Sequence, residues 1–200
     1  NLGGGYKVGR MSYEKAGSTD LQTVGEPVKE AFATFAQKTG REIKLEIEPG
    51  TFLVANSGTL LTSIQDMTTT GSSGHKFLKL DSGMTDVLRP SLYGAQHPIV
   101  LMKEGAAMNP LEKYVIVGHC CESGDLFSCA PGDPESLDER ALPKVEIGDL
   151  LSIEGSGAYC SSMSTKNYNS FPEAPEVLVG MNKEIHLIRK RQSMDQMLSN

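Results

Sequence analysis

The hydrophobic periodicity of this chain changes abruptly near residue 50, and this change limits the folds that the chain can adopt. Residues 24–40 place apolar side chains three and four positions apart, which predicts an amphipathic helix that Gly40 ends. Residues 43–47 then alternate apolar and charged side chains, which predicts a strand that stops at Pro49-Gly50. A helix, a strand and a glycine-containing loop in this order are typical of a parallel α/β unit.

Beyond this point, short apolar runs alternate with turn residues and no second long amphipathic helix is evident. The runs are TFLVANSGTLLTSIQ, HKFLKLD, HPIVLM, KYVIVG, DLLSIEG, EVLVG and EIHLIR. Short strands at regular spacing with glycine turns predict a β-sandwich or β-barrel, followed by a short helix beyond Gln192. We therefore expect an α/β part over residues 1–51 and an all-β domain over residues 52–200.

The composition excludes several classes of function. The chain has 200 residues, of which 38% are hydrophobic and 22% charged, as in ordinary soluble domains. Its net charge is −6 and no basic cluster stands out, which argues against a nucleic-acid surface. No apolar run approaches the roughly 20 residues of a membrane span, and NLGGGYKVGR does not resemble a signal peptide. We expect a cytoplasmic protein with small-molecule partners.

The four cysteines do not form the pattern of a metal site. Paired zinc ligands with C-x2-C spacing are absent from the sequence, and adjacent cysteines in a strand point to opposite faces. A domain of this size with a normal core does not need disulfides. We therefore expect neither a metal nor a disulfide at Cys120, Cys121, Cys129 and Cys160.

Five places collect residues that a site could use, and each has a plainer interpretation. Glycine triplets also occur in simple loops, Glu-Pro-Gly also ends strands, and a free cysteine is more often a small buried hydrophobe than a catalyst. A lone arginine on a β domain is usually on the surface, and a tyrosine among small residues usually packs. The five places are Gly3–Gly5, Glu48–Gly50, Arg89 with Tyr93, Cys121–Asp125, and Tyr159.

The order of these motifs along the chain is more informative than any one of them. The chain reads GGG, EPG, DSGMTDVLRPSLY, CESGD, GAY and NYNSFP, in that order. This order resembles the C-terminal half of the pyridoxal-phosphate decarboxylases with an alanine-racemase-type barrel, and among them the diaminopimelate decarboxylases. The resemblance covers nearly the whole chain. It implies the last units of a cofactor-binding (β/α)8 barrel over residues 1–51, followed by a C-terminal β-sandwich or β-barrel domain over residues 52–200.

The resemblance also assigns residues to the cofactor, pyridoxal 5′-phosphate. Backbone N–H groups of the glycine loop and of Gly50 would hold the phosphate, and the hydroxyl of Tyr159 would add a side-chain contact. The carboxylate of Glu48 would hydrogen-bond the pyridine nitrogen and keep it protonated, so that the ring accepts electrons as carbon dioxide leaves. The glycines of the loop are Gly3, Gly4 and Gly5.

The resemblance further implies that the substrate is an amino acid and that the enzyme is a homodimer whose active sites are shared between the two subunits. Cys121 would reach the partner's site and deliver a proton near the reacting carbon. Glu122 would bind the distal ammonium of the substrate, and Arg89 with Tyr93 would bind its distal carboxylate. The activity implied is that of a lyase of lysine biosynthesis, which converts meso-diaminopimelate to L-lysine and carbon dioxide.

The sequence departs from the family in two respects. The family motif is Glu-Pro-Gly-Arg, whereas this chain has Thr51 in place of the arginine, and a threonine cannot form a bidentate contact with a carboxylate. A decarboxylase of D-lysine or D-ornithine is therefore the alternative. In addition, the Schiff-base lysine belongs to the family's N-terminal half, so this chain alone is expected to be inactive. A β-domain dimerisation module is the non-enzyme alternative.

Overall fold

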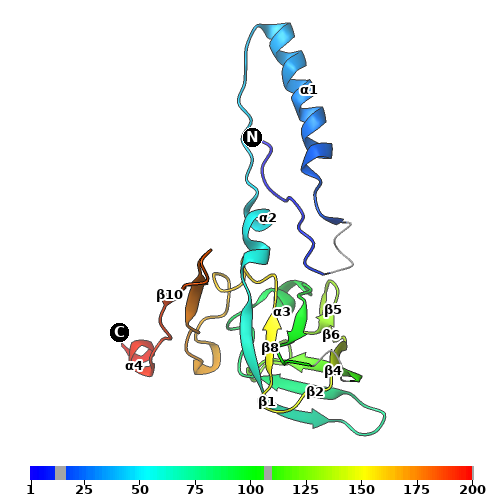
Figure 1. Ribbon diagram of the computed structural model, residues 1–200, viewed down its shortest axis with the longest axis vertical. Coiled ribbons are helices and arrows are strands. Elements are labelled where there is room, and N and C mark those ends of the chain that lie inside the picture. Colours follow the sequence, from blue (N-terminus) through cyan, green and yellow to red (C-terminus); the bar gives the residue numbers. More distant parts are fainter. Residues whose placement is uncertain (12–16, 106–109, 200) are drawn as a thin grey trace.

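The computed structural model describes residues 1–11, 17–105 and 110–199. Its N-terminal residues project from a β domain as an arm, which we define as residues 1–49 (Figure 1). The predicted helix is confirmed as α1 (Leu21–Thr39), which begins three residues earlier than the periodicity indicated. The Asp20 carboxylate accepts a hydrogen bond from the Gln22 N–H, and Gly40 ends the helix with a left-handed φ of 68°.

The strand predicted over residues 43–47 does not form. The segment is extended, but it makes only two backbone hydrogen bonds with the start of the chain. Leu2 N–H donates to Glu46 O at 3.0 Å, and Glu48 N–H donates to Gly3 O at 2.7 Å. A strand of a parallel sheet requires neighbours on both sides, and the described residues supply a short partner on one side alone.

The β domain begins with two short helical turns and continues as a six-stranded sheet. The sheet order is β3-β8-β1-β2-β4-β7, in which β2 and β4 are parallel and the other pairs antiparallel. The edge strands β3 and β7 contact each other, so the sheet is nearly closed and barrel-like. The elements are α2 (Gly50–Val54), η2 (Ala55–Ser57), β1 (Leu60–Thr69), β2 (Lys76–Leu80), α3 (Arg89–Tyr93), β3 (Ile99–Leu101), β4 (Leu111–Val117), β7 (Arg140–Pro143) and β8 (Leu150–Ile153).

The interior of this sheet holds the hydrophobic core. Alternate residues of β1 and β2 point inward, as the two-residue period of a strand requires. The largest of the fully buried side chains among the described residues is that of Phe127, which follows β4 and packs among residues from six strands. The core comprises Ile64, Leu78, Leu80, Val87, Leu101, Tyr114, Ile116, Phe127, Leu142, Val145, Leu151, Ile153 and Cys160.

A hairpin and a short helix complete the chain beside the β domain (Figure 1). The hairpin pairs β9 (Glu176–Val179) with β10 (Ile185–Arg189), and most of its side chains are exposed. Arg189 ties it to the rest of the molecule by donating to Ala174 O at 3.0 Å and to Ser161 Oγ at 2.8 Å. The helix α4 (Met194–Leu198) confirms the helix predicted beyond Gln192 and begins with a capping box.

All seven predicted apolar runs contain a strand, but three strands, the helix α3 and the 3-10 helix η4 (Tyr168–Ser170) lie outside these runs and were missed. The three strands are β7 and the two strands of a small sheet, β5 (Cys129–Ala130) and β6 (Asp133–Leu137). The missed strands are short, and β6 and β7 carry proline, which sequence rules count against a strand. They tolerate it because each lies at the edge of its sheet. The start of the first run, which we expected to be a strand, forms α2 and η2 instead.

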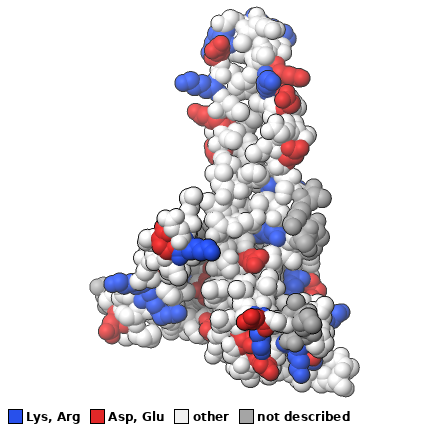
Figure 2. Space-filling model, viewed as in Figure 1, with Lys and Arg blue, Asp and Glu red and all other residues white. Residues whose placement is uncertain are grey.

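The surface charges and the cysteines do not indicate a particular binding site. Acidic and basic side chains are interspersed on the face shown in Figure 2, without a large patch of one sign. All four cysteines are free thiols, and no group of three potential metal ligands occurs among the described residues. Within the same residues, none of the helices combines the length and hydrophobicity that crossing a bilayer requires.

Candidate functional site

Most of the residues predicted to bind the cofactor line one cavity. The cavity has a volume of about 700 Å³ and lies where the arm meets the β domain. We call it the glycine cavity. Its walls include residues from three separate parts of the sequence: the start of the chain, the segment before α2, and the turn after β8. The predicted residues that line it are Gly4, Gly5, Glu48, Gly50, Thr51 and Tyr159.

The glycine loop needs its glycines for two reasons. Gly3 and Gly5 have φ values of 70° and 80°, a left-handed conformation that side chains rarely adopt. Gly4 has ordinary φ, but a Cβ atom there would collide with the carbonyl oxygen of Glu48. The triplet thus brings its backbone directly against the Glu-Pro-Gly segment. Gly3 takes part in this turn without itself lining the cavity.

Tyr159 closes the cavity from the β domain. It has a φ of 55°, which is unusual for a residue with a side chain, and its buried neighbours Ala158 and Cys160 fix the turn. A Cβ atom added to Gly50 would lie 3.3 Å from the Tyr159 hydroxyl, so the phenol reaches the backbone of Gly50. The hydroxyl and this backbone therefore face the same part of the cavity.

Glu48 is held to the glycine loop by Asn1, a residue that sequence reasoning missed. The Asn1 Nδ2 donates to the Glu48 carboxylate at 2.8 Å, and the Asn1 Oδ1 accepts from Gly3 N–H at 2.6 Å. The cavity thus combines backbone N–H groups, a hydroxyl and an exposed carboxylate. These are the groups that a phosphate and a protonated ring nitrogen require, so the residues present fit pyridoxal phosphate.

Arg89 and Tyr93 lie together on α3 but do not line the glycine cavity. The Arg89 guanidinium carbon lies 5.8 Å from the centre of the Tyr93 ring, and its Nε is buried without a hydrogen-bond partner. Burial raises the pKa of the Cys160 thiol, and the charge of Arg89 opposes this shift. Arg89 therefore lies within electrostatic reach of Cys160, the residue that follows Tyr159.

Cys121 and Glu122 belong to a different region of the chain's surface. Both are exposed, and Glu122 lines a second cavity of about 760 Å³ that shares no residue with the glycine cavity. A single chain therefore does not bring Cys121 together with the predicted cofactor-binding residues.

Asp125 fixes the loop that carries Cys121, and sequence analysis gave it no role. Its carboxylate is buried and accepts hydrogen bonds from Met84 N–H at 2.7 Å and from Cys120 N–H at 2.9 Å. Burial raises the pKa of Asp125. Burial first, and the nearby Asp125 second, raise the pKa of Cys120 to about 12, so Cys120 remains a thiol near neutral pH. Asp125 thus connects the DSGM and CESGD motifs.

Asn169 holds the same loop from the other side. Its Oδ1 accepts a hydrogen bond from the Cys121 N–H at 2.9 Å. Asn169 has a φ of 51°, and its neighbours Asn167 and Ser170 also have positive φ. Nearby, the His119 ring stacks on Phe171 with centroids 3.5 Å apart. The signal in the sequence was the NYNS motif itself, since asparagine tolerates the left-handed region better than most residues.

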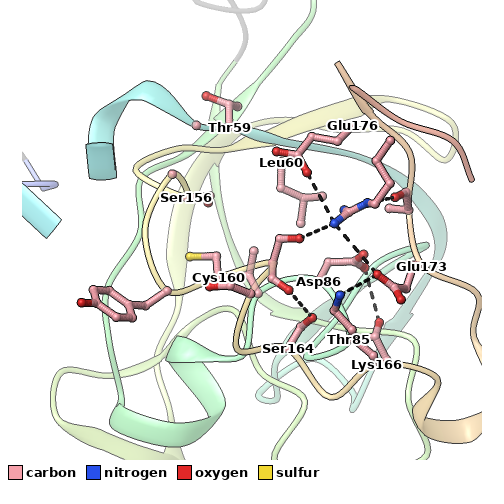
Figure 3. Close-up of a pocket in the computed structure, with 18 of the residues that line it drawn as sticks. Thr59, Leu60, Thr85, Asp86, Ser156, Cys160, Ser164, Lys166, Glu173 and Glu176 are labelled. Atoms are coloured by element: carbon pink, nitrogen blue, oxygen red, sulfur yellow. Dashed lines mark hydrogen bonds and ion pairs between the residues drawn. The ribbon is translucent and has the colours of Figure 1, made fainter. Parts of the chain in front are cut away.

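A third cavity, of about 480 Å³, lies between the start of β1, the turns after β8 and the segment before β9 (Figure 3). Its charged lining is internally paired, since Lys166 Nζ lies 2.8 Å from Glu173 Oε2 and Arg189 lies 3.4 Å from Glu176. Asp86 also faces it, and burial raises the pKa of this carboxyl. Tyr159 lines both this cavity and the glycine cavity, so the two share a wall.

Comparison with known proteins identifies relatives over most of the chain. Residues 13–157 match the family model "Pyridoxal-dependent decarboxylase, C-terminal sheet domain". The diaminopimelate decarboxylase of Escherichia coli K12 is 42% identical over 167 residues, which are 82% of this chain and 38% of that protein. The chain therefore spans well under half the length of this relative.

Solved structures agree with the sequence match. A crystal structure of diaminopimelate decarboxylase is 37% identical and superposes with a TM-score of 0.88, over 98% of this chain and 45% of that one. The diaminopimelate decarboxylase from Helicobacter pylori complexed with L-lysine is 32% identical with a TM-score of 0.79, over 98% and 42%. The chain therefore belongs to the pyridoxal-dependent decarboxylases that carry this C-terminal sheet domain.

Proposed function

We propose that this chain is the C-terminal part of a decarboxylase that converts meso-diaminopimelate to L-lysine and carbon dioxide. In this proposal residues 1–51 are the last units of a cofactor-binding (β/α)8 barrel, and residues 52–200 are the β domain that completes the site. The observation that carries the proposal is the gathering of Gly4, Gly5, Glu48, Gly50 and Tyr159 around one cavity.

The chain's contribution to cofactor binding follows from these groups. Backbone N–H groups of the glycine loop and of Gly50 bind the phosphate, since a backbone without side chains permits close approach. The Tyr159 hydroxyl donates to the same phosphate. The Glu48 carboxylate faces the ring nitrogen and holds its proton. Pyridoxal phosphate supplies an electron sink for the electrons left on the substrate's α-carbon when carbon dioxide departs.

The remaining roles require a homodimer. Cys121 of the partner subunit delivers a proton to the α-carbon, and the partner's Glu122 binds the substrate ammonium. Both side chains are exposed and lie apart from the glycine cavity of their own chain, which suits action in another subunit. Asp125 and Asn169 hold this loop by its backbone, so the thiol has a defined position from which to transfer a proton.

The choice of substrate rests on two opposing observations. The relatives described above are diaminopimelate decarboxylases, and one of their structures contains L-lysine, the product proposed here. Thr51, which lines the glycine cavity, cannot form a bidentate contact with a distal carboxylate, and this favours D-lysine or D-ornithine as the alternative.

The test is carbon dioxide release by the complete enzyme that contains this chain, with meso-diaminopimelate and D-lysine compared side by side. We expect meso-diaminopimelate to be decarboxylated much faster. Cys121→Ser should reduce kcat by roughly 10²- to 10⁴-fold, the usual contribution of a positioned proton donor. The matched control is Cys120→Ser, which should change kcat little. Faster turnover of D-lysine would refute the proposed substrate, and no release from either would refute the function and leave a dimerisation module.

A further inference from the structure

The glycine cavity is lined by an arginine that the motif comparison left out. Among the described residues, its lining includes two cations: Lys7, which is exposed, and Arg10, which is half-buried. Thr51 lies in the same lining and carries no charge. A substrate with a distal carboxylate would therefore find a hydroxyl at position 51 and the guanidinium of Arg10 in the same cavity.

Arg10 is anchored to the β domain across the cavity. Its Nε donates to Gly155 O at 3.0 Å, which fixes the plane of the guanidinium. Gly155 has a φ of 66°, and a Cβ atom there would lie 2.9 Å from Arg10 Cδ. The Gly155 turn is thus shaped to receive the Arg10 side chain. This contact joins the arm to the turn that leads into Tyr159.

Arg10 has the donor geometry that a carboxylate requires. Its guanidinium lies in the lining of the glycine cavity together with Thr51. The planar fork of a guanidinium matches the geometry of a carboxylate, so Arg10 can form the bidentate contact that Thr51 cannot.

We propose that Arg10 binds the distal carboxylate of the substrate and so replaces the cation that Thr51 does not provide. This proposal rests on the proposed decarboxylase function. It identifies Arg10 as the residue that lets this enzyme prefer a substrate with two carboxylates over D-lysine, although position 51 is a threonine.

A cofactor phosphate would be attracted by the same guanidinium, and the two anions have different consequences. If Arg10 binds the carboxylate, loss of Arg10 weakens the binding of meso-diaminopimelate and leaves the binding of D-lysine unchanged. If Arg10 binds the phosphate, loss of Arg10 weakens the binding of the cofactor and lowers the turnover of both amino acids equally. Arg10 shares the cavity lining with Thr51, the position at which the family has an arginine, and this favours the carboxylate.

The experiment compares Arg10→Gln with the matched control Arg41→Gln in the complete enzyme, since Arg41 is exposed on the arm and lines none of the three cavities described above. A hydrogen bond to a charged group corresponds to roughly tenfold to a hundredfold in affinity. Arg10→Gln should therefore lower kcat/KM for meso-diaminopimelate by that factor, mainly through KM, and leave kcat/KM for D-lysine and the Kd of the cofactor unchanged. Arg41→Gln should change none of these quantities. Adding Thr51→Arg to Arg10→Gln should restore much of the loss.

A second readout does not depend on turnover. Calorimetric titration of the enzyme with pimelate, a dicarboxylate without ammonium groups, should show binding that Arg10→Gln weakens and Arg41→Gln does not. Equal losses on both amino acids with a raised cofactor Kd, or unchanged pimelate binding, would overturn the role of Arg10. If the unaltered enzyme decarboxylates neither amino acid, the proposed function fails, and the pimelate titration still decides whether Arg10 binds a carboxylate.

Discussion

The arm and the β domain differ in where their apolar side chains go. The helix α1 contains no buried residue, and Ile43, Leu45 and Ile47 of the arm are each more than two fifths exposed. In the β domain, by contrast, thirteen residues form one buried cluster. Both regions have clear hydrophobic periodicity. Periodicity therefore predicts which face of an element is apolar, whereas the burial of that face depends on whether a neighbouring element is present to cover it.

The largest expected effect tests this difference directly. Phe127 is 2% exposed in the core, and Phe127→Ala should lower the free energy of unfolding by about 3–5 kcal/mol. Phe32 is on the apolar face of α1 and is only half-buried, so Phe32→Ala should lower it by less than about 1 kcal/mol. Urea unfolding of this chain, followed by circular dichroism, measures both.

The same pair of substitutions also examines the proposed barrel. In the complete enzyme, other parts of the barrel should cover Phe32, and Phe32→Ala should then lower the free energy of unfolding several times more than in this chain. Phe127→Ala should lower it by the same amount in both, because the neighbours of Phe127 all belong to the β domain. An equally large effect of Phe32→Ala in this chain would mean that the arm has a core of its own, and the comparison would fail.

The fold was predictable from the sequence to the extent that it depends on local pattern. The helix α1 and the strand-containing runs follow from side-chain spacing, and Gly40 ends α1 as its residue type predicts. The 43–47 strand was predicted on the same basis and does not form, because strand pairing depends on a second segment. The helix α3 could have been found, since Pro90 stands in its first turn and Gly94 ends it in a left-handed conformation.

For the candidate site, the sequence supplied residue types but not their arrangement. Gly4, Gly5, Glu48, Gly50 and Tyr159 were predicted together by resemblance, and they line one cavity. The residues that hold the loops in place had no such signal. Asn1, Asp125 and Asn169 each make a side-chain hydrogen bond to a residue far away in the sequence, and no periodicity encodes a contact of that kind. Arg10 was missed for the same reason.

A second prediction concerns the loop that carries Cys121. A Cβ atom at Gly118 would overlap the buried carboxylate of Asp125, so Gly118→Ala should lower the free energy of unfolding by about 1–3 kcal/mol. At Gly124, in the same loop, the nearest atom is a side-chain oxygen of Glu122 at 3.8 Å, and Gly124→Ala should have little effect. Urea unfolding of the two variants decides this, and similar losses would show that Asp125 does not restrict the loop.

In the arm, a glycine substitution should have the opposite sign. Gly25 lies within α1 with no atom within 4 Å of an added Cβ, so Gly25→Ala should stabilise the helix by about 0.5–1 kcal/mol. Gly40→Ala should destabilise it, because Gly40 has a φ of 68°. Hydrogen exchange of the α1 amides is the suitable measurement, since the helix is not part of the β-domain core. A slower exchange in Gly40→Ala would contradict this account of the helix end.

The smallest effect concerns Asp86, whose carboxyl faces the third cavity near His119 and Arg189. Burial raises its pKa above the ordinary value of 3.8, so the folded state binds this proton more tightly than the unfolded state. The resulting stability is present at pH values below the unfolded pKa and is lost as the pH rises through the raised folded pKa. Asp86→Asn mimics the protonated form, so it should gain stability relative to the unaltered chain as the pH increases.

The matched control is Asp133→Asn. The Ser136 hydroxyl lowers the pKa of Asp133, so this carboxylate stabilises the fold above its unfolded pKa and loses that effect as the pH falls. Urea unfolding from about pH 3 to about pH 8 should therefore give difference curves of opposite slope for the two variants. Parallel slopes would mean that burial does not raise the pKa of Asp86. Because Asp86 belongs to the β domain, the result should be the same in this chain and in the complete enzyme.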